Sequence, residues 1–319
     1  LFLRDLGNGQ LQQLTRGIEN VAAPRFAVDG SGLVRTDKGW LTIDPRSGLI
    51  SAVADLRFED DPLDGKKDES LRETQLRLFD TLQQAREERK AVRDEELRLR
   101  AADDSRAVAP WYLGKERRAV VVDASPDKRW LLMATEPADS GRGETGKMPL
   151  FVTESGYTEI EDVRTRVGRK PPVGQELELL DLRDRKRIAL DLSSLPGIKD
   201  DPLSALRTGD DAPKAPDLRP ITLLGSLWSD DGRQVALQLR SIDNKDRWLL
   251  TIEPGRDGER LTVQHRLTDP AWINWSFNDF GWLPDNRTLW FVSEHSGYAH
   301  LYLKRINGRR SRAVTQGSW

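Results

Sequence analysis

The sequence predicts an all-β fold, a partial β-propeller of about four to five blades with one long helical arm inserted. A unit of turn, apolar strand, turn and amphipathic strand recurs along the chain. It is clearest in KGWLTIDPRSGLISAV (Lys38–Val53), DRWLLTIEPGRDGERLTVQ (Asp246–Gln264) and, for its first half, RWLLMATEP (Arg129–Pro137). Apolar residues also alternate with others, as at Val235, Leu237 and Leu239, which is typical of strands. A sandwich or another barrel is the alternative.

Four turn signals divide the chain into these units. Each contains an Asp-Gly or Pro-Asp type step, which supplies the backbone freedom and Asx hydrogen bonding of a tight turn. They are VDGSG, SPDKR, SDDGR and LPDNR, marked by Asp29, Asp127, Asp231 and Asp285 and spaced by 98, 104 and 54 residues. The shortest spacing is close to one four-stranded blade of about 40–50 residues. The longer spacings therefore predict blades that contain insertions.

One segment, Lys66–Asp104, predicts a helix. It contains no glycine or proline and is rich in strong helix formers. A narrow apolar seam is expected from residues seven apart with two additions, namely Leu71, Leu78, Ala85, Val92, Leu99, Phe79 and Leu82. Interleaved acids and bases indicate a solvated helix with i,i+4 ion pairs. The arm packs on the propeller by one edge, or it docks a second subunit or covers an entrance.

Composition limits the classes of function. The chain has 319 residues, a formal charge of −2, no cysteine and three histidines. We expect no disulfide, no thiol nucleophile, no metal site and no cofactor, and no general attraction to nucleic acid. No apolar run is long enough to span a membrane. The chain begins inside a strand–turn–strand pattern, so a fragment of something longer is expected.

Ser293, Glu294 and His295 are the residue types of a serine hydrolase triad, but their spacing excludes one. On a strand, Ser293 and His295 would share a face about 7 Å apart, with Glu294 on the other face. A triad needs hydrogen-bond contacts in series, and no serine here lies in a G-x-S-x-G turn. Ser296-Gly297 instead predicts the turn of a hairpin.

Paired carboxylates are the other candidates for chemistry. They are Glu87-Glu88, Glu95-Glu96 and the cluster of Glu159, Glu161 and Asp162. Paired acids could serve glycoside chemistry or bind a substrate ammonium, although adjacent acids are common on solvated helices. The segment Gly156–Gln175 predicts a decorated loop or an extended hairpin. It is either an interaction surface or a solvated edge.

The last forty residues, FGWLPDNRTLWFVSEHSGYAHLYLKRINGRRSRAVTQGSW (Phe280–Trp319), closely resemble a propeller blade of the dipeptidyl peptidase IV branch of the prolyl oligopeptidase family. Its S-x-x-x-G-Y-x-H-L-Y hairpin and T-x-G-x-W strand start are the matching motifs. Upstream, FVTESGYTEIEDVRTRVGR (Phe151–Arg169) looks like the long blade extension of that family. It precedes a strand equivalent to QELELLDL (Gln175–Leu182).

The resemblance implies that residues 1–319 are a partial propeller domain of a serine exopeptidase, with residues 66–104 as an inserted arm. The triad of the family lies in a C-terminal α/β-hydrolase domain, which is expected to be absent from this chain, so none of its residues is assigned as catalytic. A Glu-Glu pair that binds the substrate N-terminus would fall in the arm, at Glu87 and Glu88, although no aromatic-flanked motif stands there.

The expected partners are peptide substrates and a second copy of the chain. The resemblance implies a homodimer, formed through Gly156–Pro172 and the helical arm. The compartment that it implies is the bacterial periplasm, with the cytoplasm left open. A non-enzymatic β-propeller that binds peptides or proteins is the second hypothesis, with the helical arm as its partner site.

Overall fold

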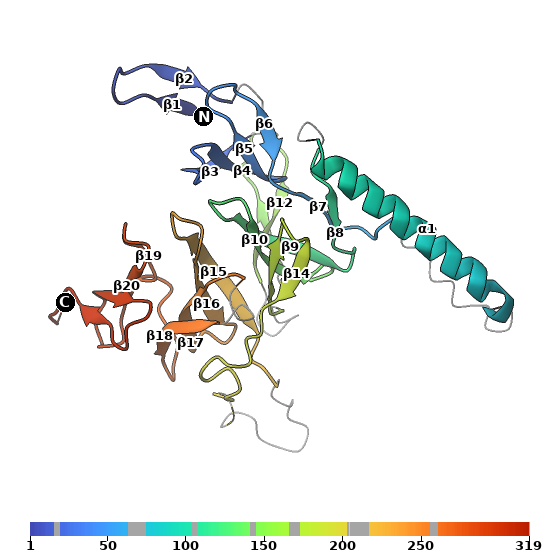
Figure 1. Ribbon diagram of the computed structural model, residues 1–319. Helices are drawn as coiled ribbons and strands as arrows, with labels where there is room; N and C mark the ends of the chain where they lie inside the picture. Colours follow the sequence, from blue (N-terminus) through green and yellow to red (C-terminus); the bar gives the residue numbers. More distant parts are fainter. Residues whose placement is uncertain are drawn as a thin grey trace. The chain divides into compact units, whose positions relative to one another are not determined.

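The computed structural model describes residues 1–15, 20–62, 75–103, 107–140, 145–165, 173–202, 204, 217–255 and 261–318 (Figure 1). It divides into two compact units, one of Leu1–Phe26 with Gly30–Arg117, and one of Ala27–Asp29 with Arg118–Trp319. The described secondary structure is almost entirely β, with one long α-helix.

Four four-stranded sheets contain most of the described strands, and within each the strands follow one another in chain order. In the first unit, the sheet contains β3 (Ala22–Phe26), β4 (Gly32–Thr36), β5 (Gly39–Ile43) and β6 (Ile50–Ala52). In the second unit, the first sheet contains β9 (Arg117–Ala124), β10 (Trp130–Pro137), β13 (Glu176–Asp181) and β14 (Lys186–Ala189). The next contains β15 (Ile221–Trp228), β16 (Val235–Ser241), β17 (Asp246–Ile252) and β18 (Thr262–Thr268). The last contains β19 (Phe280–Trp282), β20 (Thr288–Ser293), β21 (His300–Arg305) and β22 (Arg312–Ala313). Each is an antiparallel four-stranded sheet of the kind that forms a β-propeller blade, which confirms the predicted fold class.

The four predicted turns occupy the same place in all four sheets, between the first and the second strand. The residue after each aspartate has a positive φ, as Gly30 (82°), Lys128 (59°), Gly232 (71°) and Asn286 (53°). In three of the turns the aspartate Oδ1 accepts the backbone N–H two residues later, from Arg129 (3.1 Å), Arg233 (3.1 Å) and Arg287 (3.0 Å). The same kind of positive-φ turn therefore joins the first two strands of each sheet.

The sheet of β15–β18 has apolar residues on both faces, because the second unit stacks its sheets face to face (Figure 1). Leu237, Leu239 and Trp248 pack with Leu132 and Leu179 of the β9–β14 sheet. On the other face, the residues that pack with the β19–β22 sheet are Ala236 and Leu249, against Leu289, Phe291 and Tyr302. The alternation predicted for residues 234–240 thus has a physical cause, since odd-numbered and even-numbered residues of β16 face different neighbouring sheets.

In the first unit, a small core of Leu14, Val34 and Ile43 lies beside the two-stranded sheet of β1 (Phe2–Arg4) and β2 (Leu11–Gln13). Two further strands, β7 (Asp55–Arg57) and β8 (Pro110–Tyr112), pair in parallel. The helix α1 (Gln75–Ala101) lies between them in sequence. Parallel neighbours need a long crossover, and here the inserted arm supplies it. The sequence predicted the helix but not this pairing.

The helix falls within the predicted segment; residues 66–74 and 104 lie outside the described residues. Its surface is solvated as expected, with ion pairs Glu95–Arg98 (2.8 Å) and Glu96–Arg100 (2.7 Å). Two members of the predicted seam remain open to solvent, Val92 at 59% and Leu99 at 39% exposure. Arg93 donates to Asp61 at 2.5 Å, which ties the helix to the segment after β7.

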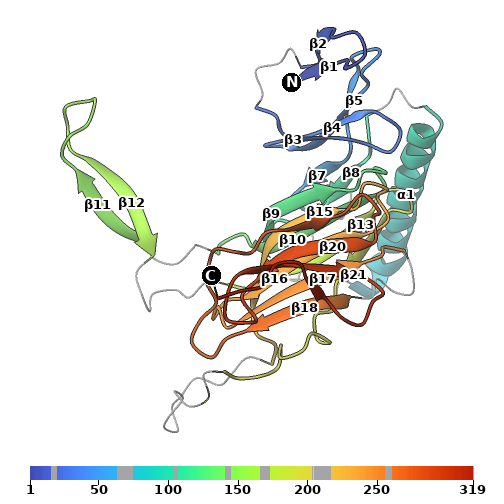
Figure 2. The same cartoon turned by 90° about the vertical axis from the view of Figure 1, so that its left-hand side faces the viewer.

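The second interruption is a two-stranded antiparallel hairpin, β11 (Thr145–Leu150) and β12 (Glu159–Thr165) (Figure 2). It stands in sequence between β10 and β13, two strands that pair directly from Trp130↔Asp181 to Thr135↔Glu176. The extended hairpin expected in Gly156–Gln175 is present but begins earlier, at Thr145, so that segment supplies only the end of its turn and its second strand; residues 166–172 lie outside the described part. Both insertions fall in the long spacings between turn markers, as the spacing predicted.

Candidate functional site

Ser293, Glu294 and His295 do not assemble a triad. The strand β20 ends at Ser293, so the expectation that all three lie on one strand is wrong: Glu294 and His295 belong to the turn that follows. The turn reaches Gly297, whose φ is 95°. The His295 backbone N–H donates to Ser293 Oγ at 3.3 Å, but the His295 ring does not bond to the serine.

The histidine that does contact Ser293 comes from the preceding sheet. His265 on β18 places Nε2 2.8 Å from Ser293 Oγ, and its ring lies 4.7 Å from that of Phe291. Burial lowers the pKa of His265 to about 4, with smaller electrostatic contributions from the neighbouring His295, Lys304 and Arg247. The imidazole is therefore neutral at pH 7.

This serine–histidine pair lacks what nucleophilic catalysis needs. Ser293 is only 2% exposed, and among the described residues the structure gives His265 no carboxylate partner. A nucleophile must reach substrate, and its base must be held by an acid in the triad arrangement. The pair instead joins two neighbouring blades by a hydrogen bond. Sequence reasoning could not find it, because the two residues are 28 positions apart.

Glu87 and Glu88 lie on α1, and both side chains are exposed. Gln84 Nε2 donates to Glu88 Oε1 at 3.4 Å, which is a contact along the helix surface. Adjacent helical residues diverge by about 100°, so the two carboxylates do not point at a common place. Their role as a site for the substrate N-terminus stays a prediction.

The β11–β12 hairpin displays apolar side chains to solvent. Tyr157 is 81% exposed, Ile160 70%, Phe151 77% and Val152 97%. Its tip has a defined shape, because Thr153 Oγ1 donates to the Tyr157 carbonyl at 2.5 Å and Gly156 turns the chain with φ 73°. A locally ordered hairpin with exposed aromatic and aliphatic side chains is typical of an interaction surface.

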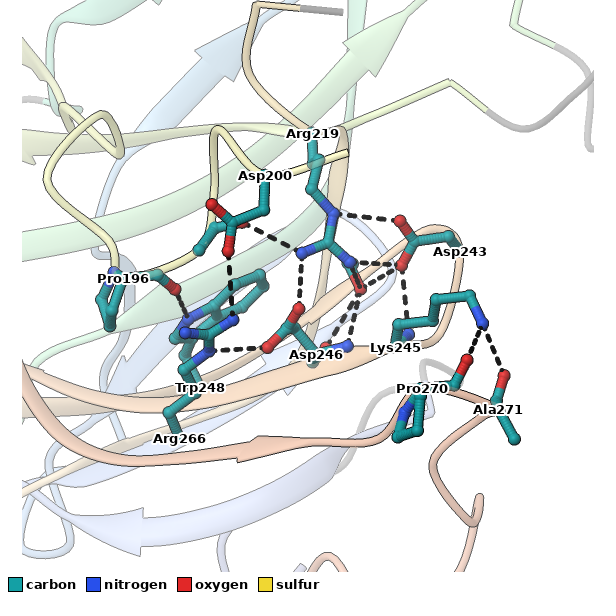
Figure 3. A network of polar contacts seen from close by, with 12 residues as sticks. Pro196, Asp200, Arg219, Asp243, Lys245, Asp246, Trp248, Arg266, Pro270 and Ala271 are labelled. Carbon is teal, nitrogen blue, oxygen red and sulfur yellow. Dashed lines mark hydrogen bonds and ion pairs between the residues drawn. The ribbon is translucent and has the colours of Figure 1, made fainter. Parts of the chain in front are cut away.

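A buried ionic network joins the β15–β18 sheet to the segment that precedes it (Figure 3). Arg219, with a side chain 4% exposed, donates to Asp243 (2.6 Å) and Asp246 (2.5 Å). Burial works against both charges of the Arg219–Asp243 pair. The hydrogen bonds outweigh it, so the pKa of Arg219 is raised and that of Asp243 is lowered.

The same network fixes the chain at residues 196–200. Arg219 Nη1 donates to the Gly197 carbonyl at 3.1 Å, and Trp248 Nε1 donates to the Pro196 carbonyl at 2.9 Å. Arg266 completes it through Asp246 (2.7 Å) and Asp200 (3.8 Å). Every charge in this network has an opposite partner, so its role is to hold the fold. No sequence pattern predicts it, since Arg219 and Asp246 are 27 residues apart.

The described part of the chain holds no group of three or more metal-ligating His, Asp or Glu side chains. None of the described helices is both long and apolar enough to cross a bilayer.

Comparison with known proteins gives a family match over the C-terminal third of the chain. Residues 210–319 match the model of the dipeptidyl peptidase IV N-terminal region. Among solved structures, the chain is similar to dipeptidyl peptidase 4 of Porphyromonas gingivalis, with 14% identity, 100% of this chain and 36% of that chain covered, and a TM-score of 0.52. A Bacteroides ovatus protein assigned as a dipeptidyl aminopeptidase IV gives 12% identity, 99% and 36% coverage, and a TM-score of 0.48.

TolB of Acinetobacter baumannii is a more distant likeness, with 10% identity, 100% and 49% coverage, and a TM-score of 0.39. The likeness to the Porphyromonas structure concerns the fold, and it supports the propeller. The chain spans about a third of the length of the two peptidase structures, 36% in each case.

Proposed function

We propose that this chain, which carries a dipeptidyl peptidase IV N-terminal region at residues 210–319, is the propeller portion of a serine exopeptidase. In this proposal it admits peptides and positions their N-termini for a hydrolase domain of the intact protein. The observation that carries the proposal is the family match, which falls on the last blades. The lack of a usable nucleophile at Ser293 is consistent with a non-catalytic portion.

The test compares the intact protein with this chain alone. A fluorophosphonate probe should label the intact protein, and the intact protein should cleave a Gly-Pro reporter substrate. This chain alone should give neither signal. Cleavage by the isolated chain would refute the division of labour. An intact protein that neither reacts with the probe nor cleaves short peptides would favour a binding scaffold instead.

The proposed recognition of the substrate N-terminus rests on Glu87 and Glu88. In the intact protein, Glu87→Gln with Glu88→Gln should raise KM for Gly-Pro substrates, because a carboxylate lost from an ammonium site weakens binding. The matched control is Glu95→Gln with Glu96→Gln, two turns further along the same helix, which should leave KM unchanged. Equal rates on free and N-blocked substrates by the unmodified protein would remove this role.

We also propose that the protein is a homodimer, joined through Gly156–Pro172 and the helical arm. The exposed side chains of Tyr157 and Ile160 support the first of these contacts. Tyr157→Ser with Ile160→Ser should convert the dimer to monomer in sedimentation velocity. Val314→Ser changes a side chain that is 45% exposed outside the hairpin, and it should not shift the equilibrium. A dimer that survives the double substitution would exclude the hairpin.

A further inference from the structure

Two arginines lie opposite each other near the ends of β16 and β17. Arg240 and Arg247 are direct partners in the strand register, on either side of the short turn formed by residues 242–245. Arg247 is 6% exposed, and Arg240 is half-buried. Side chains directly opposite on an antiparallel pair lie about 5 Å apart at Cβ, so two positive charges are held close together.

The segment Asp269–Asp279 is held beside these arginines by hydrogen bonds to its carbonyl groups. Asn244 Nδ2 donates to Ile273 (2.8 Å), and Gln238 Nε2 donates to Asn278 (2.9 Å). Lys245 Nζ reaches Pro270 and Ala271, as Figure 3 shows. The segment is thus fixed at its start, middle and end.

Both arginines contact this segment. Arg247 Nη2 donates to the Asn274 carbonyl at 2.5 Å, and the Arg240 guanidinium lies 4.1 Å from the centre of the Trp275 ring. Trp275 is 62% exposed and Phe277 48%. Phe277 also has a φ of 54°, in the left-handed region that a bulky side chain rarely adopts. Strained residues and exposed aromatics are features that collect at binding sites.

The two guanidiniums differ in their partners from other arginines of the second unit. Arg129 pairs with Asp181 (2.8 Å), Arg187 with Glu178 (2.7 Å) and Arg219 with two aspartates. Among the described residues, neither Arg240 nor Arg247 has a carboxylate within ion-pair distance. The Nε atoms of both are buried and lack a hydrogen-bond partner.

Electrostatics agree with this geometry. Burial lowers the pKa of Arg240. The pKa of Arg247 is also lowered, first by burial and then by the charge of Arg240, while Glu294 opposes the shift. Two positive charges, one buried and one half-buried, with one neighbouring negative charge leave an excess of about one positive charge. Burying an unpaired charge is unfavourable, so the arrangement favours an anion of single charge as the missing partner.

We propose that Arg240 and Arg247 bind the carboxylate group of a peptide ligand, with the Trp275 ring against the apolar part of the same ligand. A guanidinium presents parallel N–H donors that match the two oxygens of a carboxylate. The excess of one charge suits a carboxylate better than a doubly charged phosphate. That the ligand is a peptide rests on the proposed function, whereas carboxylate binding by the two arginines does not.

The test uses this chain and small probes. N-acetyl-aspartate N-methylamide, the matching asparagine compound and inorganic phosphate are titrated while the arginine Nε–H signals are followed by nuclear magnetic resonance. The aspartate compound should shift the signals of Arg240 and Arg247, and the asparagine compound should bind at least tenfold more weakly. Equal binding of both compounds, no binding of either, or tighter binding of phosphate would overturn the proposal.

Substitutions separate a binding role from a structural one. Arg240→Met keeps an unbranched apolar side chain beside Trp275 but removes the charge, so it should weaken binding of the aspartate compound at least tenfold while the thermal midpoint stays the same or rises. The matched control is Arg233→Met, at a side chain that is 80% exposed, which should change neither quantity. A lowered midpoint with unchanged binding by Arg240→Met would show that the arginine only supports the Trp275 ring. The measurement is binding to this chain, so its outcome does not depend on whether the intact protein has peptidase activity.

Discussion

Gly232 occupies the position of positive φ in the turn between β15 and β16. The structure predicts that glycine is required here both for its backbone conformation and because a neighbouring turn leaves no room for a Cβ atom. A Cβ atom at Gly232 would lie 2.8 Å from the backbone nitrogen of Asp127, which belongs to the equivalent turn of the preceding sheet. A backbone nitrogen cannot swing away as a side chain would. Any larger residue at 232 must therefore push two neighbouring blades apart.

Gly232→Asn separates the two effects, because Asn286 holds the same conformation in the last turn with a φ of 53°. We expect a cost of about 1 kcal/mol for the left-handed conformation of asparagine and about 1–3 kcal/mol more for the overpacked contact. The free energy of unfolding should fall by roughly 2–4 kcal/mol in total, which urea titration measures. In a thermal scan each kcal/mol corresponds to a midpoint shift of about 2–4 °C.

The control is Gly30→Asn, at the same turn position with φ 82° and nothing within 4 Å of the added Cβ. This variant should lose only about 1 kcal/mol. Equal losses at the two sites would refute the reasoning, since they would show that the contact between the turns contributes nothing.

Two more predictions follow from buried charged and titratable groups. His265 has a folded-state pKa of about 4 against 6.5 when unfolded, so the unfolded state takes up more protons as pH falls; stability should be full above pH 6.5 and decrease by up to about 3 kcal/mol between pH 6.5 and 4. His265→Gln should remove that part of the pH dependence in urea unfolding at several pH values, and an identical pH profile for the variant would contradict it. Arg219→Met leaves Asp243 and Asp246 without their shared partner, so we expect a loss of about 3–5 kcal/mol, whereas Arg233→Met at the surface should change stability by less than about 0.5 kcal/mol. Calorimetry of both variants measures the difference, and a small effect at Arg219 would mean that Arg266 alone can compensate Asp246.

Features coded by neighbouring residues could be predicted from the sequence. The aspartate turns, the alternation in β16, the long helix and the extended hairpin all depend on local geometry, and the structure contains each of them. The turn markers also indicated the correct places of the insertions, because an aspartate turn joins the first two strands of every four-stranded sheet.

Features that join distant residues could not be predicted. His265 reaches Ser293 from another sheet, and Arg219 meets Asp246 only after the chain has formed two strands. The parallel pairing of β7 with β8 spans the whole helix. Arg240 and Arg247 look like ordinary surface residues in the sequence. Only the strand register places them opposite each other, and only the folded structure shows that no described carboxylate lies within ion-pair distance of either.

The hairpin insertion has a consequence for how this chain tolerates change. The strands β16 and β17 are joined by four residues, whereas β10 and β13 are joined by 38, from Ala138 to Gln175. Loop closure entropy grows only with the logarithm of length, so the longer connection adds about 2 kcal/mol to the cost of pairing. The two strands pair without interruption from Trp130↔Asp181 to Thr135↔Glu176. The Arg129–Asp181 ion pair lies at the end of these strands that is opposite the insertion. A blade closed in this way can gain, lose or exchange its outer segment while its inner strands stay in place. New contacts can therefore arise on this fold by lengthening one connection, with the rest of the sheet left as it is.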